Sequence, residues 1–437
     1  MKQAATLILL LVAAPLAASL QERINAAPAG SIVEVQAGTY RGDLVIDRPL
    51  RLIGRGRPLL IGSGRGTVVQ IRAAGVTVEG FDIDGQGGGD LAQDPSGIHI
   101  AAKSAVVRNC RIERTLFGVY LREADGATVE GCVIRGIRGK DPGEKGSGIH
   151  IWNTVGFRIT GNTILDVRDG LYIQASSHGL IARNEARELR YGLHYMFSDD
   201  NTFEDNSFSD GAAGAALMYS RRIVFRRNRF VHNRGFASVG LLLKSCDDTL
   251  AENNLVADNA RGIFVEGSTN NIFRGNIIAN SDVALVLYDS ITGNRFEGNS
   301  FVGNMTPLML VGRRTDTRLD GNYWSDNEEP DLDGDGRTDR PYRLSSVFDH
   351  FRGNLSAADL FSESLAARAL GTAERMFPVL DAVAVVDAAP LVRPPSLPRV
   401  PRAPARERHA NAFGLATSLA GIAGGSGVLL RARRRRR

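Results

Sequence analysis

A segment that recurs about every 22 residues is the feature that most constrains the fold of this chain. Each copy begins with a glycine, and the first and third residues after that glycine are apolar or aromatic. These glycines are Gly148, Gly170, Gly192, Gly214, Gly240 and Gly262. An asparagine keeps nearly the same spacing, at Asn162, Asn184, Asn206, Asn228, Asn254, Asn276, Asn299 and Asn322. Self-similarity at this period predicts a solenoid, in which each repeat packs on its neighbours.

Between these markers, polar and apolar residues alternate in twos, which indicates short strands rather than helices. Segments 157–160 and 223–226 show this alternation. A leucine-rich repeat would share the period, but its consensus is absent from the sequence. One asparagine in each turn can bond to the next across the roughly 4.8 Å between neighbouring strands. The sequence therefore predicts an all-β fold, a right-handed parallel β-helix over residues 19–325 with about 22 residues per coil.

The residues before the repeats predict export and a cap. Residues 1–18 contain Lys2 followed by an apolar run, which is typical of a secretory signal peptide. Ser19 is a favourable N-cap for a short amphipathic helix that starts at Leu20. Such a helix would cover the open end of the β-helix.

The residues after the repeats predict four further segments. They are an acidic loop at 326–345, a C-terminal helical docking segment at 346–393, a Pro/Arg-rich linker at 394–410 and a membrane anchor at 411–437. Ala412–Leu430 is uncharged and precedes an arginine-rich tail, which favours an anchor with its tail in the cytoplasm. A sorting signal that is cleaved remains the alternative for this segment, because it contains the pair Gly424 and Gly425.

Charge and cysteine content argue against nucleic-acid binding and against a disulfide-stabilised fold. The formal net charge of +5 depends on six arginines in the last seven residues, so the rest of the chain carries about −1. This balance predicts no nucleic-acid binding by the folded part. The three cysteines are expected to be single buried thiols rather than a disulfide framework. Cys132 occupies the asparagine position, and Cys110 is expected one place further along its strand, pointing to the opposite face.

The glycine-anchored strand should have an unusual outward face. Its second and fourth residues point outward, because side chains alternate along a strand. The second position gives the column His99, Tyr120, His150, Tyr172, His194, Ala216, Leu242, Phe264 and Val286. The fourth gives Ala101, Arg122, Trp152, Gln174, Met196, Met218, Lys244, Glu266 and Tyr288. A face with so many rings and methionines normally binds something or is covered by something.

Two interpretations of this outward face stay open. A loop, the C-terminal segment or a partner protein would cover it and make it an additional core. Alternatively, His194, Met196 and Met218 form a metal site, because the two methionines occupy one position on adjacent coils. Thioether and imidazole ligands together select Cu(I) over harder ions.

A second candidate metal site lies in the acidic loop. Asp331, Asp333, Asp335 and Asp339 fall at positions 1, 3, 5 and 9 of a calcium loop of the EF-hand type. Position 12 is Tyr342, where a carboxylate is expected. A structural calcium ion and a plain acidic turn both remain possible here.

Several motifs of the chain resemble the NosD family, periplasmic accessory proteins of nitrous-oxide reductase maturation, within the β-helical carbohydrate-binding and sugar-hydrolase repeat proteins. The matching segments are Gly38–Asp47, Gly192–Asn201, Ala216–Ser220, Gly262–Ser268, Asn322–Asp326, Ala373–Pro378 and Asp387–Pro394. The similarity extends from residue 20 to about residue 394. It implies a non-catalytic β-helix that handles copper as a transient cargo, and the three copper candidates lie within matching motifs.

The resemblance also implies partners. They are the ATPase and membrane subunits of an ABC transporter, a copper-chaperone lipoprotein and nitrous-oxide reductase. With the expected anchor, this gives a periplasmic protein tethered to the inner membrane.

The alternative is a polysaccharide lyase or epimerase of the same architecture, or a non-catalytic carbohydrate-binding protein. Its sugar platform would consist of Trp152, Tyr172, His194, Asp199 and Asp200. The sequence shows no cluster of acids with a basic partner in one outward column, which argues against catalysis.

Overall fold

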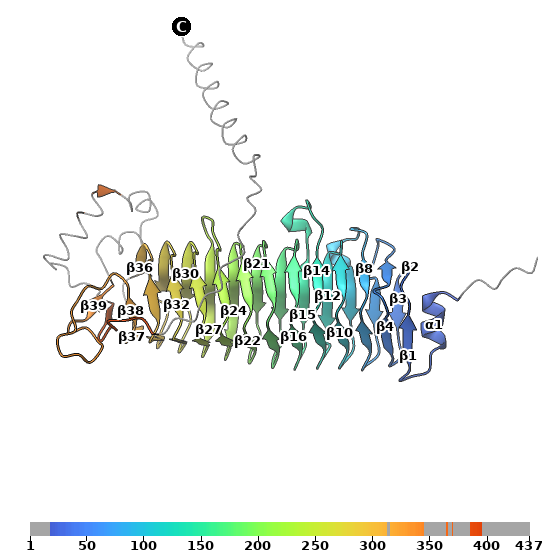
Figure 1. Cartoon of the computed structure of the whole chain (residues 1–437), viewed down its shortest axis with the longest axis horizontal. Coiled ribbons are helices and arrows are strands. Elements are labelled where there is room, and N and C mark those ends of the chain that lie inside the picture. The colour runs from blue at the N-terminus through green and yellow to red at the C-terminus, as the bar shows by residue number, and fades with distance from the viewer. Residues whose placement is uncertain (1–17, 313–314, 345–363, 366–368, 370–384, 396–437) are drawn as a thin grey trace, which may run out of the picture. The chain divides into compact units, whose positions relative to one another are not determined.

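The computed structural model describes residues 18–312, 315–344, 364–365, 369 and 385–395. The chain divides into two units, residues 1–395 and 396–437, and every described residue belongs to the first. This unit is a stack of parallel strands that begins with one short helix (Figure 1). The predicted fold is confirmed, since the stack is a right-handed parallel β-helix of about 13 coils with about 22 residues per turn.

Three sheets run along the stack. Sheet A contains β1 (Ile32–Val35), β4 (Arg51–Gly54), β7 (Thr77–Glu79), β10 (Val106–Arg108), β13 (Thr128–Glu130), β16 (Arg158–Thr160), β19 (Leu180–Ala182), β22 (Thr202–Glu204), β25 (Val224–Arg226), β28 (Leu250–Glu252), β31 (Ile272–Arg274), β34 (Arg295–Glu297), β37 (Arg318–Asp320), β40 (Val386–Asp387) and β39 (Tyr342–Arg343). Sheet B contains β2 (Thr39–Arg41), β5 (Leu59–Ile61), β8 (Asp82–Asp84), β11 (Arg111–Glu113), β14 (Val133–Arg135), β17 (Thr163–Leu165), β20 (Glu185–Arg187), β23 (Ser207–Ser209), β26 (Arg229–Val231), β29 (Leu255–Ala257), β32 (Ile277–Ala279), β35 (Ser300–Val302) and β38 (Tyr323–Trp324). Sheet C, which holds the glycine-anchored strands, contains β3 (Leu44–Ile46), β6 (Val69–Ile71), β9 (Ser96–Ile100), β12 (Phe117–Arg122), β15 (Ser147–Trp152), β18 (Asp169–Gln174), β21 (Tyr191–Met196), β24 (Ala213–Arg221), β27 (Val239–Asp247), β30 (Arg261–Glu266), β33 (Val283–Tyr288) and β36 (Thr306–Val311).

The core consists of inward side chains stacked coil upon coil. The predicted inward residues of sheet C, such as Ile149 and Ile151, are fully buried. Aromatic rings also stack in the interior, and the centroids of Phe273 and Phe296 are 4.3 Å apart. The regular register brings like residues together, so the apolar stacks remove water along the whole axis.

A ladder of asparagines links the coils, as the sequence predicted. The Oδ1 atom of Asn184 accepts hydrogen bonds from the backbone N–H of Asn162 at 3.0 Å and from its Nδ2 at 2.9 Å. Asn184 Nδ2 in turn donates to the carbonyl of Ile159 at 2.9 Å. The same pattern repeats to Asn322. Each amide therefore satisfies buried backbone groups that the bend between sheets A and B would leave unpaired.

Asp387 ends this ladder at the C-terminal side of the stack. Its Oδ2 accepts hydrogen bonds from the backbone N–H of Asn322 at 2.9 Å, from Asn322 Nδ2 at 2.9 Å and from Trp324 Nε1 at 3.1 Å. Its Oδ1 accepts from the N–H of Gly321 at 3.1 Å. A carboxylate suits this place because it accepts hydrogen bonds without needing a further acceptor beyond the last coil.

The short helix α1 (Leu20–Ala26) closes the N-terminal end, as predicted. Ser19 is its N-cap, and Ser19 and Glu22 form a reciprocal capping box. Leu20 and Ile24 are buried against the first coil. This helix therefore covers apolar surface that the first coil would otherwise expose.

The prediction for the cysteines is partly wrong. All three are buried free thiols, as expected. The register, however, pairs Arg108 with Glu130 and Arg111 with Val133, which places Cys110 directly opposite Cys132. The two residues lie 22 positions apart, so they occupy the same place on adjacent coils and not opposite faces.

Some predicted segments lie outside the described residues. These are residues 1–17 of the signal peptide, most of the helical docking segment, nearly all of the linker and the whole anchor. Within the docking segment, residues 385–393 contain the strand β40 instead of a helix, because Asp387 pairs with Leu319 of β37 and Val386 pairs with Arg343 of β39. Among the helices that the structure describes, none has the length and apolar character needed to cross a membrane.

Replacing Asp387 with alanine should destabilise the C-terminal end of the stack. The substitution leaves buried donors of Asn322 and Trp324 without acceptors, at a cost of about 2–4 kcal/mol in the free energy of unfolding. Urea unfolding followed by fluorescence measures this loss. Asp320→Ala is the matched control, because the Asp320 side chain is 71% exposed. Equal destabilisation by both substitutions would contradict the role of Asp387 as the end of the ladder.

Candidate functional site

The outward face of sheet C carries a ladder of rings across five successive coils. The ring centroids of His99 and Tyr120 are 5.1 Å apart, and those of Tyr120 and His150 are 4.4 Å apart. His150 stacks on Tyr172 at 4.5 Å, and Tyr172 meets the edge of His194 at 4.8 Å. These distances follow from the spacing of parallel strands, because each ring occupies the same position on its coil.

Two loops cover the N-terminal half of this ring ladder. Leu91 lies in the short 3-10 helix η1 (Leu91–Gln93) between β8 and β9. Ile137 lies between β14 and β15, in a loop that also contains η2 (Pro142–Glu144). Both side chains pack against a buried cluster that includes Phe117 and Tyr120. The interpretation that the outward face is a covered, additional core therefore holds for these coils.

The coils that carry His194, Met196 and Met218 have no such insertion. Sheet B connects to sheet C through short segments before β18, β21 and β24. These segments are 166–168, 188–190 and 210–212. The next longer connection is 232–238, before β27. The candidate copper ligands thus lie on the stretch of sheet C between two longer connections.

His150, in the covered part, is a neutral imidazole. Burial is the main cause that lowers the pKa of His150 to about 3, and the positive charge of Arg168 lowers it further. Its Nδ1 atom is buried and has no hydrogen-bond partner among the described residues. The ring therefore acts as an apolar, stacked group at neutral pH.

A charged cluster centred on the buried Asp169 lies against His194. Asp169 is fully buried, and Arg190 donates to its two oxygens through Nε at 2.9 Å and Nη2 at 2.6 Å. His194 Nδ1 lies 3.3 Å from Asp169 Oδ2, and also 3.3 Å from Arg190 Nη2. Burial alone would raise the pKa of Asp169, but hydrogen bonds from His194 and Arg190 lower it to about 2. The carboxylate is therefore ionised and held in place.

The sequence analysis missed this cluster, because it considered only the second and fourth residues after each glycine as outward, and Asp169 lies in neither column. Asp169 directly precedes Gly170, and strict alternation along the strand would place its side chain inside. The alternation is interrupted at Gly170, where an added Cβ would meet Ala186 of the core, and Asp169 contacts His194 on the outward side. The available signal was the 22-residue spacing of Arg168 and Arg190, which places two arginines in one column beside a single aspartate.

Met196 and Met218 lie directly opposite each other on β21 and β24. His194 is two residues before Met196 on the same strand, so the structure brings all three candidate copper ligands to one face. Met218 packs beside the apolar cluster of Ala213, Ala216 and Val239. The hydroxyl of Tyr172 lies 4.0 Å from the sulfur of Met196.

The residues that follow the methionines are exposed. Phe197 is 53% exposed and Tyr219 is 48% exposed, and their rings stack with centroids 5.1 Å apart. The two stacked rings form an exposed apolar surface directly after Met196 and Met218 in the chain.

The proposed sugar platform is brought together only in part. Tyr172 and His194 belong to the ring ladder, and Arg122 lies over the ring of Trp152 at 5.1 Å. Asp199 and Asp200 lie in the turn after β21 and form ion pairs with Arg221 and Arg222. These two acids are therefore held by neighbouring arginines, away from the buried cluster.

The acidic loop between β38 and β39 brings three of its four predicted ligands together. Oxygen atoms of Asp331, Asp333 and Asp335 all lie within 4.8 Å of one another. The fourth, Asp339, uses Oδ2 to accept a hydrogen bond from the N–H of Leu332 at 2.7 Å. Asp331 accepts hydrogen bonds from the N–H groups of Gly334 and Gly336, at 2.7 and 3.0 Å. These bonds fold the loop around its carboxylates.

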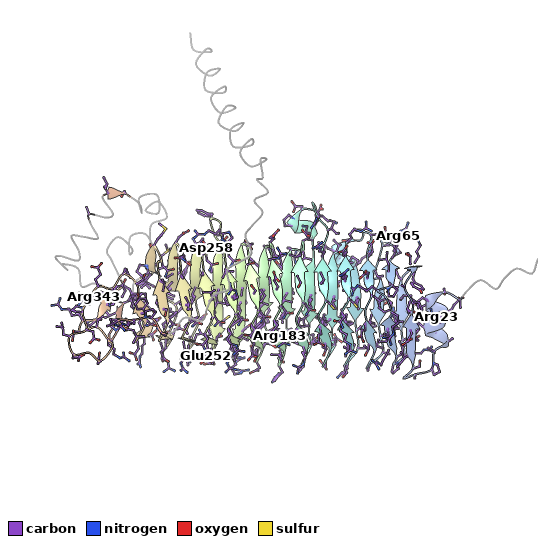
Figure 2. The ribbon with its side chains drawn as sticks, viewed as in Figure 1. Arg23, Arg65, Arg183, Glu252, Asp258 and Arg343 are labelled. Atoms are coloured by element: carbon purple, nitrogen blue, oxygen red, sulfur yellow. The ribbon has the colours of Figure 1, made fainter. Side chains whose placement is uncertain are left out.

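The other faces of the stack are charged, which sets sheet C apart. Figure 2 labels Arg183, Glu252 and Asp258 among the many charged side chains along the stack. On sheet A, Glu252 pairs with Arg226 of the preceding coil at 3.3 Å. Ion pairs of this kind between neighbouring coils are ordinary for a solvated sheet face.

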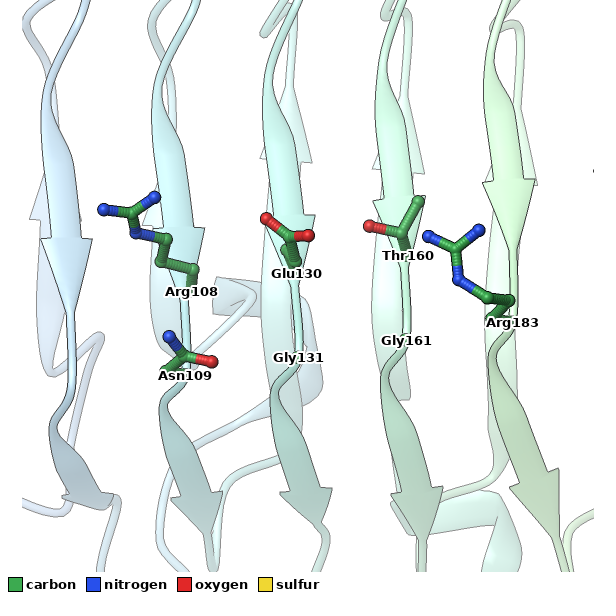
Figure 3. Close-up of a pocket in the computed structure, with 7 residues that line it drawn as sticks. All are labelled: Arg108, Asn109, Glu130, Gly131, Thr160, Gly161 and Arg183. Carbon is green, nitrogen blue, oxygen red and sulfur yellow. The ribbon is translucent and has the colours of Figure 1, made fainter.

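A shallow depression lies at the corner between sheets A and B (Figure 3). It is lined by Arg108, Asn109, Glu130, Gly131, Thr160, Gly161 and Arg183. It exists because Gly131 and Gly161 occupy a turn position at which neighbouring coils carry side chains. Arg108 is already paired with Glu79 at 2.8 Å. The predicted site residues lie elsewhere.

Comparisons with known proteins identify the family resemblance. Residues 136–329 match the family model described as periplasmic copper-binding protein (NosD). A Pseudomonas aeruginosa protein named "Probable ABC transporter binding protein NosD" is 34% identical over 136 residues, which is 31% of this chain and 32% of that protein. A Stutzerimonas stutzeri protein of the same name is 29% identical over 228 residues, 52% of this chain and 51% of that protein. The match thus spans about a third and about half of these relatives, and the predicted resemblance to NosD is confirmed.

Solved structures show the same fold. The family 28 exopolygalacturonase of Yersinia enterocolitica superposes with a TM-score of 0.52 at 11% identity, over 68% of this chain and 74% of that one. The DFA-IIIase of Arthrobacter chlorophenolicus has a TM-score of 0.50 at 15% identity, over 63% of this chain and 88% of that one. At these identities the likeness concerns the β-helix alone.

Replacing His150 with phenylalanine should make the stability of the protein less sensitive to acid. The unfolded state binds a proton at His150 below about pH 6.5, whereas the folded state does so near pH 3. The wild type therefore loses up to about 1.4 kcal/mol per pH unit through this group as the pH falls in that window. Urea unfolding between about pH 7 and pH 5 measures the slope. An identical slope in both proteins would refute the lowered pKa of His150 in the folded state.

Proposed function

We propose that this chain is a periplasmic accessory protein that carries Cu(I) for assembly of the copper site of nitrous-oxide reductase. The observation that supports this most is the placement of Met196, Met218 and His194 on one partly buried face, with the two methionines in register. The match of residues 136–329 to a periplasmic copper-binding family supports the same metal.

The three side chains suit Cu(I) for chemical reasons. Thioether sulfur is a soft donor, and a neutral imidazole binds the same ion, whereas the harder cations prefer oxygen. None of these ligands is a thiol that must release a proton on binding. Copper is the cargo in this proposal, so the ligands need to bind it and release it again. The protein itself does not catalyse a reaction.

The name of the two relatives supports an ABC transporter as a partner, and the family resemblance implies the other partners. The protein would work with the membrane and ATPase subunits of an ABC transporter, a copper-chaperone lipoprotein and nitrous-oxide reductase. Residues 346–384 and the predicted anchor at 411–437 would dock and tether it at the inner membrane. The exposed rings of Phe197 and Tyr219 offer a contact beside the copper ligands for the protein that delivers or receives the ion.

Removing the ligands should weaken copper binding. We expect His194→Ala and the double variant Met196→Ala/Met218→Ala each to lower the affinity of the purified full chain for Cu(I) by at least about 10-fold, since removal of outer-shell partners alone has this effect at metal sites. Anaerobic titration against a competing Cu(I) chelator measures the change.

Met305→Ala is the matched control, because Met305 is 65% exposed and precedes β36, away from the ligands. It should bind copper like the wild type. Wild-type affinity in the His194 and Met196/Met218 variants would refute the ligand assignment, and no binding by the wild type would refute the copper function.

The acidic loop holds a structural calcium ion in the same proposal. Asp331, Asp333 and Asp335 supply oxygen ligands of the type that calcium prefers. The loop is also hydrogen-bonded to the segment that carries Asp387. The N–H of Thr338 donates to the carbonyl of Pro390 at 2.9 Å, and the N–H of Val392 donates to the carbonyl of Gly336 at 3.1 Å. Calcium would therefore stabilise the end of the stack that Asp387 closes.

Calcium should raise the free energy of unfolding of the wild type by about 2.7 kcal/mol at 100 times its Kd. The double variant Asp331→Ala/Asp333→Ala should lose this increase, and Glu328→Gln, a neighbouring exposed acid, should keep it. The calcium-induced shift is compared within each variant, because the loss of Asp331 also removes hydrogen bonds. No shift in the wild type would show a plain acidic turn.

Acid–base chemistry on an acidic polysaccharide is a second candidate, favoured by the contact between Asp169 and His194. A histidine oriented by a carboxylate is a common proton-transfer group. Incubation of the wild type and the His194→Ala variant with uronate polymers separates the two functions. Cleavage or epimerisation that is lost in the variant would favour the enzyme. Met196 and Met218 would then have no role in the function.

A further inference from the structure

We infer that Asp169 is a positioning residue that holds the proton of His194 on Nδ1 and so presents the lone pair of Nε2 to Cu(I). This inference rests on the proposed copper function, and it names a group outside the three ligands. Asp169 lies on β18 and His194 on β21, so the contact joins two neighbouring coils. Asp169 itself would not touch the metal.

The geometry supports this role because only one ring nitrogen faces the charged cluster. Nδ1 of His194 lies 3.3 Å from Asp169 Oδ2, within hydrogen-bond distance. Histidine ligands of metals commonly donate their other ring N–H to a carboxylate, which fixes both the ring orientation and the tautomer. The rings of Tyr172 and Tyr191 meet the His194 ring edge-on, at 4.8 and 5.2 Å, and restrict its rotation.

Arg190 competes for the same ring nitrogen, since its Nη2 atom is also 3.3 Å from His194 Nδ1. If Arg190 donated to Nδ1, the proton would move to Nε2 and the ligand would be lost. The two contacts to Nδ1 are equal in length, so the choice between them rests on what else Arg190 and Asp169 bind. Nη2 and Nε of Arg190 are already directed at Asp169, at 2.6 and 2.9 Å, which is the bidentate geometry of a strong pair.

Asp169 also has no freedom to turn away. It is fully buried, and Arg168 approaches its Oδ2 at 3.3 Å in addition to Arg190. A lone pair on Nδ1 would face an ionised oxygen at this distance, whereas an N–H would be attracted by it. The Nδ1–H form is therefore the favoured neutral tautomer, and the two arginines hold the carboxylate that selects it.

The first test needs no metal. Protein labelled with ¹⁵N at histidine reports the tautomer of each ring by NMR, and the His194→Ala spectrum assigns the His194 signals among the seven histidines. The wild type should show the Nδ1–H form. An Nε2–H form in the folded wild type would overturn the inference, even if no Asp169 variant folds.

Variants then identify the group responsible. Asp169→Ala should move His194 to the Nε2–H form, because Arg190 becomes its only charged neighbour at Nδ1. Asp169→Asn keeps an acceptor oxygen and should retain more of the Nδ1–H form. Asp200→Ala is the matched control, since it removes a carboxylate that pairs with Arg222 at 2.7 Å in the turn after β21. It should leave the tautomer unchanged.

Cu(I) titration of the same proteins completes the test. Asp169→Ala should weaken binding by about 10- to 100-fold, as loss of an outer-shell carboxylate does at other sites, and Asp200→Ala should not. If the wild type binds Cu(I) with the Nε2–H form, the positioning role fails and the copper function stands. If the wild type has the Nδ1–H form but binds no Cu(I), the copper function fails and Asp169 loses its proposed purpose.

Discussion

The hydrogen bonds between successive coils determine almost everything else in this molecule. Each asparagine from Asn162 to Asn322 bonds both the backbone and the side chain of its neighbour, so a coil cannot slip by one residue without breaking buried bonds. A slip of one place would also turn inward side chains outward. The ladder therefore fixes which residues share a column, and the alignment of Met196 with Met218 is a consequence of that register.

The sequence was sufficient to predict those parts of the structure that depend on the repeat. The inward pairs, the outward columns and the asparagine ladder all follow from a spacing of about 22 residues and from alternation along a strand. Cys110 shows that the spacing is the better guide of the two, because counting along its strand gave the wrong face. The cap formed by Ser19 was also predictable, since capping depends on a few adjacent residues.

The sequence was not sufficient where contacts are distant or the backbone bends. Asp387 joins the ladder 65 positions after Asn322, and no periodic signal connects the two. Asp169 was missed because strict alternation along β18 would place its side chain in the interior, whereas it contacts His194 on the outward side. The structure also shows that the outward face of sheet C has a covered part and a part without covering loops, a difference that the residue types alone did not indicate. Loops bury the rings near Tyr120, whereas the coils of His194 and the two methionines lack those loops.

The buried cluster at His194 is compatible with either metal binding or proton transfer, because both need an imidazole with a fixed orientation. What differs between the two functions is the second group that must be close by. Proton transfer on a sugar needs a further acid or base beside the ring, but Asp199 and Asp200 are paired with Arg221 and Arg222 in the turn beyond β21. Transfer of a soft metal needs further soft donors, and the register supplies two thioethers on the same face. The two methionines therefore favour the proposed copper function, in which Asp169, held by Arg190, would fix the tautomer of His194.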